Sequence, residues 1–254
     1  MKIRFTAPGL LLFVLAPLRM ACQTSASAPD FDRQVSWKTM IPNLASDQKK
    51  IWTFPAKLNQ RKYLIPTLAV LGTAAALITL DPHDAPTFRN TTAFSGFNSA
   101  FSSNNTAYGT IAVPAGMYLA SFAFKDTKIR NTAMLAAEAV GDSEILATVL
   151  KDATKRVRPA NVTPGQSYSD TWFEGGSFWS NKGGFPSGHT IAAFSVATVV
   201  SRRYRNRKWV PYVAYGLAGA VAFSRVTLSA HFVSDVFVGG ALSYSISRFA
   251  VLRE

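Results

Sequence analysis

Apolar residues gather in six stretches along the chain, separated by polar segments that contain glycine and proline. They are rich in Ala, Leu and Val, and the alternation of apolar and polar residues that is typical of strands is hard to find. No repeat of fixed period indicates a solenoid. The pattern predicts an all-α fold, a helical bundle of about six core helices. The six stretches cover residues 63–80, 107–124, 132–150, 188–201, 209–224 and 236–249.

The first 62 residues contain a signal-like segment and a polar, basic segment, and they precede the six apolar stretches. Lys2 and Arg4 precede an apolar run over residues 10–18, and small residues follow, which is the layout of a secretory signal. We assign residues 1–22 to a signal peptide or N-terminal anchor, with Cys22 as a candidate site of lipid attachment. Residues 23–62 are polar and basic, and we expect an extended or loosely helical arm there. The folded domain is expected to cover residues 63–254.

The lengths of the apolar stretches leave two membrane arrangements open. The first stretch approaches a full span, whereas the third includes Glu138, Asp142 and Glu144, which are costly in hydrocarbon, and the last three are short. These features favour a bundle on the periplasmic side of the bacterial cell envelope, membrane-associated or lipid-anchored. The alternative is an integral inner-membrane protein with multiple spans, whose N-terminus stays uncleaved and cytoplasmic so that the basic loops lie inside.

Composition narrows the class of partner. Hydrophobic residues make up 48% of the 254 residues and charged residues only 16%, so the chain lies between soluble and membrane proteins. The net charge of +13 indicates an anionic partner: nucleic acid, a phospholipid surface or a phosphorylated substrate. The basic run over residues 202–208 has no recognisable nucleic-acid-binding module around it, so no nucleic acid is expected.

Two of the three histidines stand beside residues that suit anion chemistry. His189 ends a PSGH run at the start of an apolar helical stretch, where Ser187 is a candidate N-cap and free N–H groups face an anion. His231 precedes Asp235 by four residues, so on a helix the carboxylate lies one turn along and can hold one imidazole nitrogen. The other nitrogen is then free to attack a substrate.

Three cations are candidates to bind phosphate. Lys151 and Arg158 are seven residues apart, which is two helical turns, so on one helix they point the same way. Arg225 lies six residues before His231, and a bend over residues 227–230 must intervene if the two are to converge. An ammonium and two guanidinium groups suit a doubly charged phosphoryl group.

Other charged residues are expected to be structural. His83 lies between two acids in the segment 81–84, which we predict to be a polar turn rather than a metal site. Lys155 and Arg156 are expected to be solvated beside a helix end, where their charge suits the helix dipole.

Together these residues resemble the type 2 phosphatidic acid phosphatase (PAP2) family, which shares its active site with bacterial acid phosphatases and vanadium haloperoxidases. The blocks of the family, KxxxxxxRP, PSGH and SRxxxxxHxxxD, match without a substitution at residues 151–159, 186–189 and 224–235. They occur in the order of the family, and the resemblance covers a motif core of residues 107–249. It implies that residues 63–254 form a PAP2-type phosphatase domain with the PAP2/haloperoxidase bundle.

The resemblance implies a metal-independent phosphatase that hydrolyses a phosphomonoester or diphosphate through a phosphohistidine intermediate. No metal or other cofactor is expected, and vanadate is expected to act as an inhibitor or phosphate mimic. His231 would be the nucleophile, Asp235 would orient it, and His189 would act as general acid and then as base. The phosphate oxygens would be bound by Lys151, Arg158, Ser187, Gly188 and Arg225.

The segment 160–185 bears on the substrate because it is a long loop with many aromatic residues. Trp172, Phe173, Phe178 and Trp179 suit contact with an apolar part of the substrate or with a bilayer surface, and packing onto the bundle explains them equally well. We expect a lipid phosphate, hydrolysed on the non-cytoplasmic side, and the membrane surface as a partner. Two alternatives stay open: a vanadate-dependent haloperoxidase, and a non-catalytic envelope protein that retains the bundle.

Overall fold

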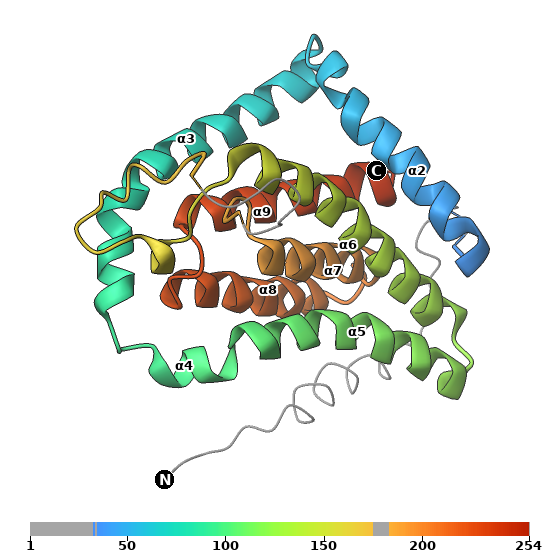
Figure 1. Ribbon diagram of the computed structural model, residues 1–254. Coiled ribbons are helices and arrows are strands. Elements are labelled where there is room, and N and C mark those ends of the chain that lie inside the picture. The colour runs from blue at the N-terminus through green and yellow to red at the C-terminus, as the bar shows by residue number, and fades with distance from the viewer. Residues whose placement is uncertain (1–32, 34, 175–182, 254) are drawn as a thin grey trace.

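The structure is a computed structural model that describes residues 33, 35–174 and 183–253, and this part of the chain is all-α (Figure 1). The predicted fold class is therefore confirmed, and the six apolar stretches correspond to α3 and α5–α9. The expected signal or anchor with Cys22, and the loop residues Phe178 and Trp179, lie outside the described residues. The α-helices are α2 (Trp37–Thr53), α3 (Arg61–Asn90), α4 (Ser95–Ala100), α5 (Ser103–Phe124), α6 (Thr127–Thr154), α7 (Gly188–Arg203), α8 (Trp209–Thr227) and α9 (Val233–Ser245).

Three shorter helical segments complete the described elements. The 3₁₀ segments Phe54–Lys57 and Pro159–Asn161 follow α2 and α6, and the π-helical segment Ile246–Val251 continues α9. Helix boundaries follow local chemistry. Asp126 caps α6 because its side chain accepts hydrogen bonds from the backbone of Lys128 and Ile129, and Lys155, with φ of 44°, ends the same helix in a left-handed conformation.

The centre of the bundle is α7, which packs against α5, α6, α8 and α9 (Figure 1). Small residues of α7 and α8, Ala193, Ala197 and Ala218, let these two helices approach closely. A larger apolar cluster joins α6 and α7 to the C-terminal segment and removes its side chains from water, which stabilises the fold. That cluster contains Leu135, Ala136, Ala139, Val196, Val199, Ile246, Ala250, Val251 and Leu252.

The arm before the domain is more regular than the sequence predicted. Ser36 and Thr39 form a reciprocal capping box at the start of α2. Asp47 of α2 is fully buried and pairs with Arg33, which also pairs with Glu138 of α6. Gln48 donates to the side chain of Asp142 at 2.9 Å. The acids of α6 thus hold the arm against the bundle.

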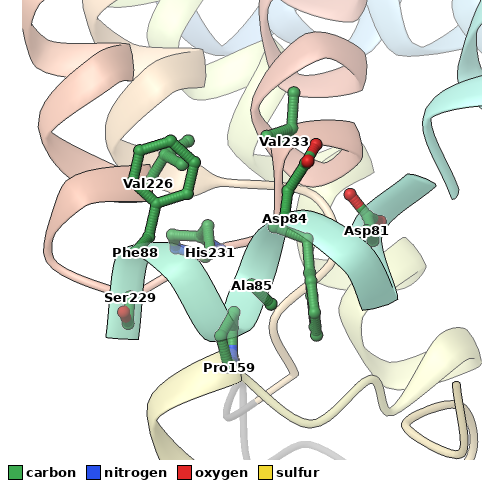
Figure 2. A pocket seen from close by; sticks show the side chains of 10 residues that line it. Asp81, Asp84, Ala85, Phe88, Pro159, Val226, Ser229, His231 and Val233 are labelled. Atoms are coloured by element: carbon green, nitrogen blue, oxygen red, sulfur yellow. The ribbon is translucent and has the colours of Figure 1, made fainter. Parts of the chain in front are cut away.

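The long helix α3 replaces the polar turn that was predicted at residues 81–84. That prediction is wrong: the helix runs through Pro82 and Pro86 to Asn90, and it changes direction along its length (Figure 1). Proline inside a helix removes a backbone hydrogen bond and bends it. The bend carries the end of α3 across the loop that bears His231, where Asp81 is buried (Figure 2).

Two helices bear on the membrane question. Among the described residues, α3 and α5 are long and apolar enough to cross a membrane, with only 6% and 17% of their apolar windows buried inside the molecule. Exposed apolar side chains on them include Ile65, Leu68, Leu71, Ile111 and Leu119. The two helices therefore present apolar surface that a membrane would cover.

Candidate active site

His231 lies in the short loop between α8 and α9 and is almost fully buried. Its Nδ1 is 2.7 Å from the carbonyl oxygen of Gly184 and 3.6 Å from Oδ2 of Asp235. A carbonyl can only accept, so Nδ1 carries the proton and donates to Gly184, and Nε2 holds the lone pair. The structure therefore places Asp235 beside the imidazole, but at a distance longer than a hydrogen bond.

Asp235 has other partners. Its Oδ2 accepts from the backbone N–H of Phe232 at 2.9 Å, and its Oδ1 accepts from Arg156 at 2.6 Å. It thus fixes the turn that presents His231. Its carboxylate also favours the charged imidazole, whereas burial, the larger effect, lowers the pKa of His231 below its usual value.

The PSGH residues form the start of α7, as predicted. Ser187 is the N-cap residue, although its Oγ accepts from Thr190 rather than from the helix backbone, and its N–H donates to the carbonyl of Asp235 at 3.1 Å. Gly188 lies against Lys151, because a Cβ added at Gly188 would be 3.0 Å from the Lys151 Nζ. The backbone at the N-terminus of α7 therefore meets an ammonium group.

Lys151 and Arg158 do not share one helix, because α6 ends at Thr154. Lys151 is nonetheless buried, with its Nζ 3.7 Å from Glu144. Arg158 lies in the following segment beside Gly184, and its Nε is buried without a hydrogen-bond partner among the described residues. The loop, rather than two helical turns, brings Arg158 near the histidines.

Arg225, near the end of α8, is fully buried. The predicted bend follows it, and the N–H of His231 donates back to its carbonyl at 3.1 Å. Its guanidinium donates to Ser103 Oγ at 3.0 Å, to the carbonyl of Phe101 and to Ser224. Burial lowers the pKa of Arg225 to about 10, so it stays charged at neutral pH.

His189 completes the group. Its Nε2 lies 3.0 Å from the carbonyl oxygen of Ser103. Burial, followed by the positive charge of Arg225 and smaller contributions from His231 and Arg158, lowers the pKa of His189 to about 4. His189 and Arg225 thus share Ser103 as a partner, and His231 and Arg158 both lie against Gly184.

Three site residues were not predicted from the sequence. Arg156, expected to be solvated, is instead buried and bonds to Asp81 and Asp235. Asp81 comes from α3, which the motifs do not include. Ser103 contacts both Arg225 and His189 from the start of α5. Of the three, only Asp81 could have been suspected from the sequence, because it is an acid at the end of a stretch that is otherwise apolar.

A small pocket lies beside His231, lined by Asp81, Asp84 and Phe88 of α3 (Figure 2). Its volume of about 10 Å³ is room for about one water molecule. The pocket is therefore too small to hold a phosphoryl group.

Comparison with known proteins agrees with this geometry. Residues 132–253 match the PAP2 superfamily. A lipid A 4'-phosphatase from Porphyromonas gingivalis is 27% identical over 106 residues, which is 42% of this chain and 43% of that protein. A lipid A 1-phosphatase from the same organism is 34% identical over 65 residues, 25% of this chain and 15% of that protein. The matches thus span less than half the length of either curated relative.

A solved structure is also similar, that of the first transmembrane PAP2 type phosphatidylglycerolphosphate phosphatase from Bacillus subtilis. The likeness covers 84% of this chain and 92% of that one, with a TM-score of 0.41 and 20% identity. The family match rests on sequence instead, and it includes all three motif blocks, from Lys151 to Asp235. Residues 132–253, just under half of this chain, therefore match the PAP2 superfamily.

Proposed function

We propose that this protein is a PAP2-type phosphatase that removes a phosphate group from a lipid through a phosphohistidine at His231. The observation that carries the proposal is the gathering of two histidines with three cations, of which Lys151 and Arg225 are buried. Arg225 and His189 share Ser103, Arg158 and His231 lie against Gly184, and Lys151 lies against Gly188. Buried charge without a carboxylate partner is costly, and Arg225 makes its described hydrogen bonds to hydroxyl and carbonyl oxygens. A bound phosphoryl group would supply the missing negative charge.

In the first step, the Nε2 lone pair of His231 attacks phosphorus, and the bond from phosphorus to the ester oxygen breaks. Nδ1 keeps its proton, held by the Gly184 carbonyl at 2.7 Å. The cations Lys151, Arg158 and Arg225, with Ser187 and the Gly188 N–H, stabilise the charge on the phosphoryl oxygens. These fixed positive groups supply the charge stabilisation that the reaction needs, so we propose that it requires no metal or other cofactor.

His189 would give a proton to the leaving ester oxygen and later take one from the water that attacks the phosphohistidine. With a pKa of about 4, it is neutral at pH 7 while no anion is bound. A phosphate dianion beside it would offset the positive charge of Arg225 and raise that pKa. Substrate binding would therefore protonate His189, which could then act as the general acid.

The lipid substrate is supported by two observations. Two proteins similar to this chain are lipid A phosphatases, as their names state. In addition, α3 and α5, which contribute Asp81 and Ser103 to the site, expose apolar surface along their length. We propose that this surface lies in or against the membrane, with the site on the periplasmic side.

The test is a substrate panel with purified protein in detergent, without divalent metal and with a chelator. The panel pairs lipid A, phosphatidylglycerol phosphate and phosphatidic acid with a soluble aryl phosphate. We expect kcat/KM to favour one of the lipids, vanadate to inhibit, and His231→Gln to lower kcat at least about 10³-fold. Lys57→Gln, in the exposed 3₁₀ segment after α2, is the matched control.

Each result bears on a different part of the proposal. Strict preference for the soluble ester would contradict the lipid substrate, and full activity of His231→Gln would contradict the nucleophile. Activity that disappears with the chelator and returns with a divalent metal would contradict the metal-free reaction.

A further inference from the structure

Arg156 is one of the most completely buried side chains of the molecule, although it lies outside the motif positions. Only 1% of it is exposed. Its Nη2 donates to Asp81 at 2.7 Å, and its Nη1 donates to Asp235 at 2.6 Å and to Ser234 at 2.7 Å. The guanidinium therefore bridges two buried carboxylates.

Two aromatic rings enclose the same guanidinium. Its central carbon lies 4.2 Å from the ring centre of Trp172 and 4.0 Å from that of Phe232. A planar cation between aromatic faces and two carboxylates is fixed in position and in orientation. Lysine would supply the charge without the paired donors or the flat surface.

Asp81 ties this arrangement to α3. It is 1% exposed, and besides Arg156 it accepts from the N–H of Ser234 at 3.2 Å and from the Ser234 hydroxyl. Ser234 is in the first turn of α9, next to Asp235. Asp81 thus holds both the guanidinium and the start of the helix that follows His231.

Arg156 also controls the two groups that face His231 Nδ1. One is Asp235, whose Oδ1 it binds while Oδ2 lies 3.6 Å from Nδ1. The other is the Gly184 carbonyl at 2.7 Å, and the Gly184 N–H donates to the Arg156 carbonyl at 2.6 Å. The side chain and the backbone of one residue therefore set both neighbours of the imidazole.

We propose that Arg156, held by Asp81 of α3, is a positioning residue for the His231 nucleophile and sets how much of the Asp235 charge the imidazole receives. The inference rests on the proposed function, because it assigns His231 as the nucleophile. It gives α3 a role in the site that the three motif blocks do not include. Arg156 itself does not contact the reacting atoms.

Two substitutions are expected to shift the pKa of His231 in opposite directions, because they remove charges of opposite sign. The charged or titratable groups around His231 are Asp235, Arg156 and Asp81 toward Nδ1, then Arg158, Arg225 and His189 in the rest of the site, and Asp84 at the small pocket. Arg156→Met leaves the Asp235 charge unopposed, so it favours the charged imidazole. Asp81→Asn keeps the shape but leaves the guanidinium wholly to Asp235, so it disfavours the charged imidazole.

The experiment is a proton NMR titration of the three histidines in detergent micelles, with each resonance assigned from a single His→Gln variant. The full chain is used throughout. We expect Arg156→Met to raise the pKa of His231 by about one unit or more, and Asp81→Asn to lower it or leave it too low to observe. Lys155→Gln, which removes a neighbouring positive charge, is the control and should leave the titration unchanged.

In the active protein we expect Arg156→Met to lower kcat about 10²-fold while KM stays within about twofold, because ground-state binding is untouched. The acid limb of the kcat profile should move to higher pH.

A structural role alone would act differently. Loosening of the site admits water and moves the His231 pKa toward its ordinary value in both variants. Equal upward shifts in Arg156→Met and Asp81→Asn, or no shift in Arg156→Met, would overturn the proposal. The titration needs no turnover, so a wild-type protein that hydrolyses none of the phosphoesters would contradict the proposed function and leave this result readable.

Discussion

Gly183 offers a sharp test of how the backbone positions the nucleophile. It precedes Gly184, whose carbonyl accepts from His231 Nδ1 at 2.7 Å. A Cβ added at Gly183 would lie 2.5 Å from the carbonyl oxygen of Lys151, a backbone atom at the end of α6. The contact has no flexible side chain that could yield, so the Gly183 backbone itself must move.

The size of the movement follows from the contact. Relief to an ordinary separation of about 3.4 Å requires a shift of about 0.9 Å. If Gly184 moves equally far, its 2.7 Å bond to Nδ1 stretches to about 3.6 Å, which is no longer a hydrogen bond. A displacement of about 1 Å in a site of this kind costs about 10²-fold in rate, and overpacking costs about 1–3 kcal/mol of stability.

We therefore expect Gly183→Ala to fold with a lowered melting temperature and to lose about 10²-fold in kcat on its best phosphoester. The control is Gly216→Ala on α8, where an added Cβ meets nothing within 4 Å and helix propensity improves. The control should keep its kcat and gain a little stability. A folded Gly183→Ala variant with wild-type kcat would refute the view that the Gly184 carbonyl positions His231.

Three further results are expected. Arg225→Lys should lower kcat/KM about 10²-fold and weaken vanadate inhibition in parallel, because lysine lacks the paired donors; unchanged inhibition would show that vanadate binds elsewhere. Vanadate added in weak buffer at pH 6.5 should cause proton uptake by the protein, read with an indicator dye, because a bound anion raises the His189 pKa from about 4. His189→Gln should abolish this uptake, and uptake that persists in the variant would contradict His189 as the group that takes the proton. Burial raises the pKa of Asp142 to about 7, so ionisation of this carboxyl destabilises the folded state, and stability falls as pH rises from about 4 to 7. Asp142→Asn should remove this loss, which is worth up to about 4 kcal/mol at pH 8. Equal melting curves for wild type and Asp142→Asn at pH 8 would contradict the prediction.

The helices and the motif residues could be predicted because they depend on local spacing. Six apolar stretches correspond to helices, and the PSGH block lies at a helix N-terminus, where its residue types favour it. The resemblance to the PAP2 family rests on three short blocks, whose spacing is specific. The residues that determine each of these features lie close together in the sequence.

The predictions that proved wrong concern residues whose contacts depend on where a helix begins or on a partner far away in the sequence. The His231–Asp235 spacing assumed one helix, but α9 begins at Val233, so Asp235 binds the Phe232 N–H and the Gly184 carbonyl takes Nδ1. Arg156 looked solvated because its partner Asp81 is 75 residues away.

The polar turn predicted at residues 81–84 fails for the same reason. The segment DPHD has turn residues, yet Asp81 finds a buried cation, and the helix continues through the prolines. Burial of a charge depends on its long-range partner, which a local pattern does not contain.

We propose that His231 carries the phosphoryl group during turnover. The most direct measurement is acid-free, alkaline quenching of the enzyme during turnover of a ³²P-labelled lipid phosphate, followed by peptide mapping. We predict a phosphoprotein that is stable in base and labile in acid, with the label on the peptide that contains His231 and absent from His231→Gln. Turnover without any labelled enzyme, or label that persists in His231→Gln, would contradict the account.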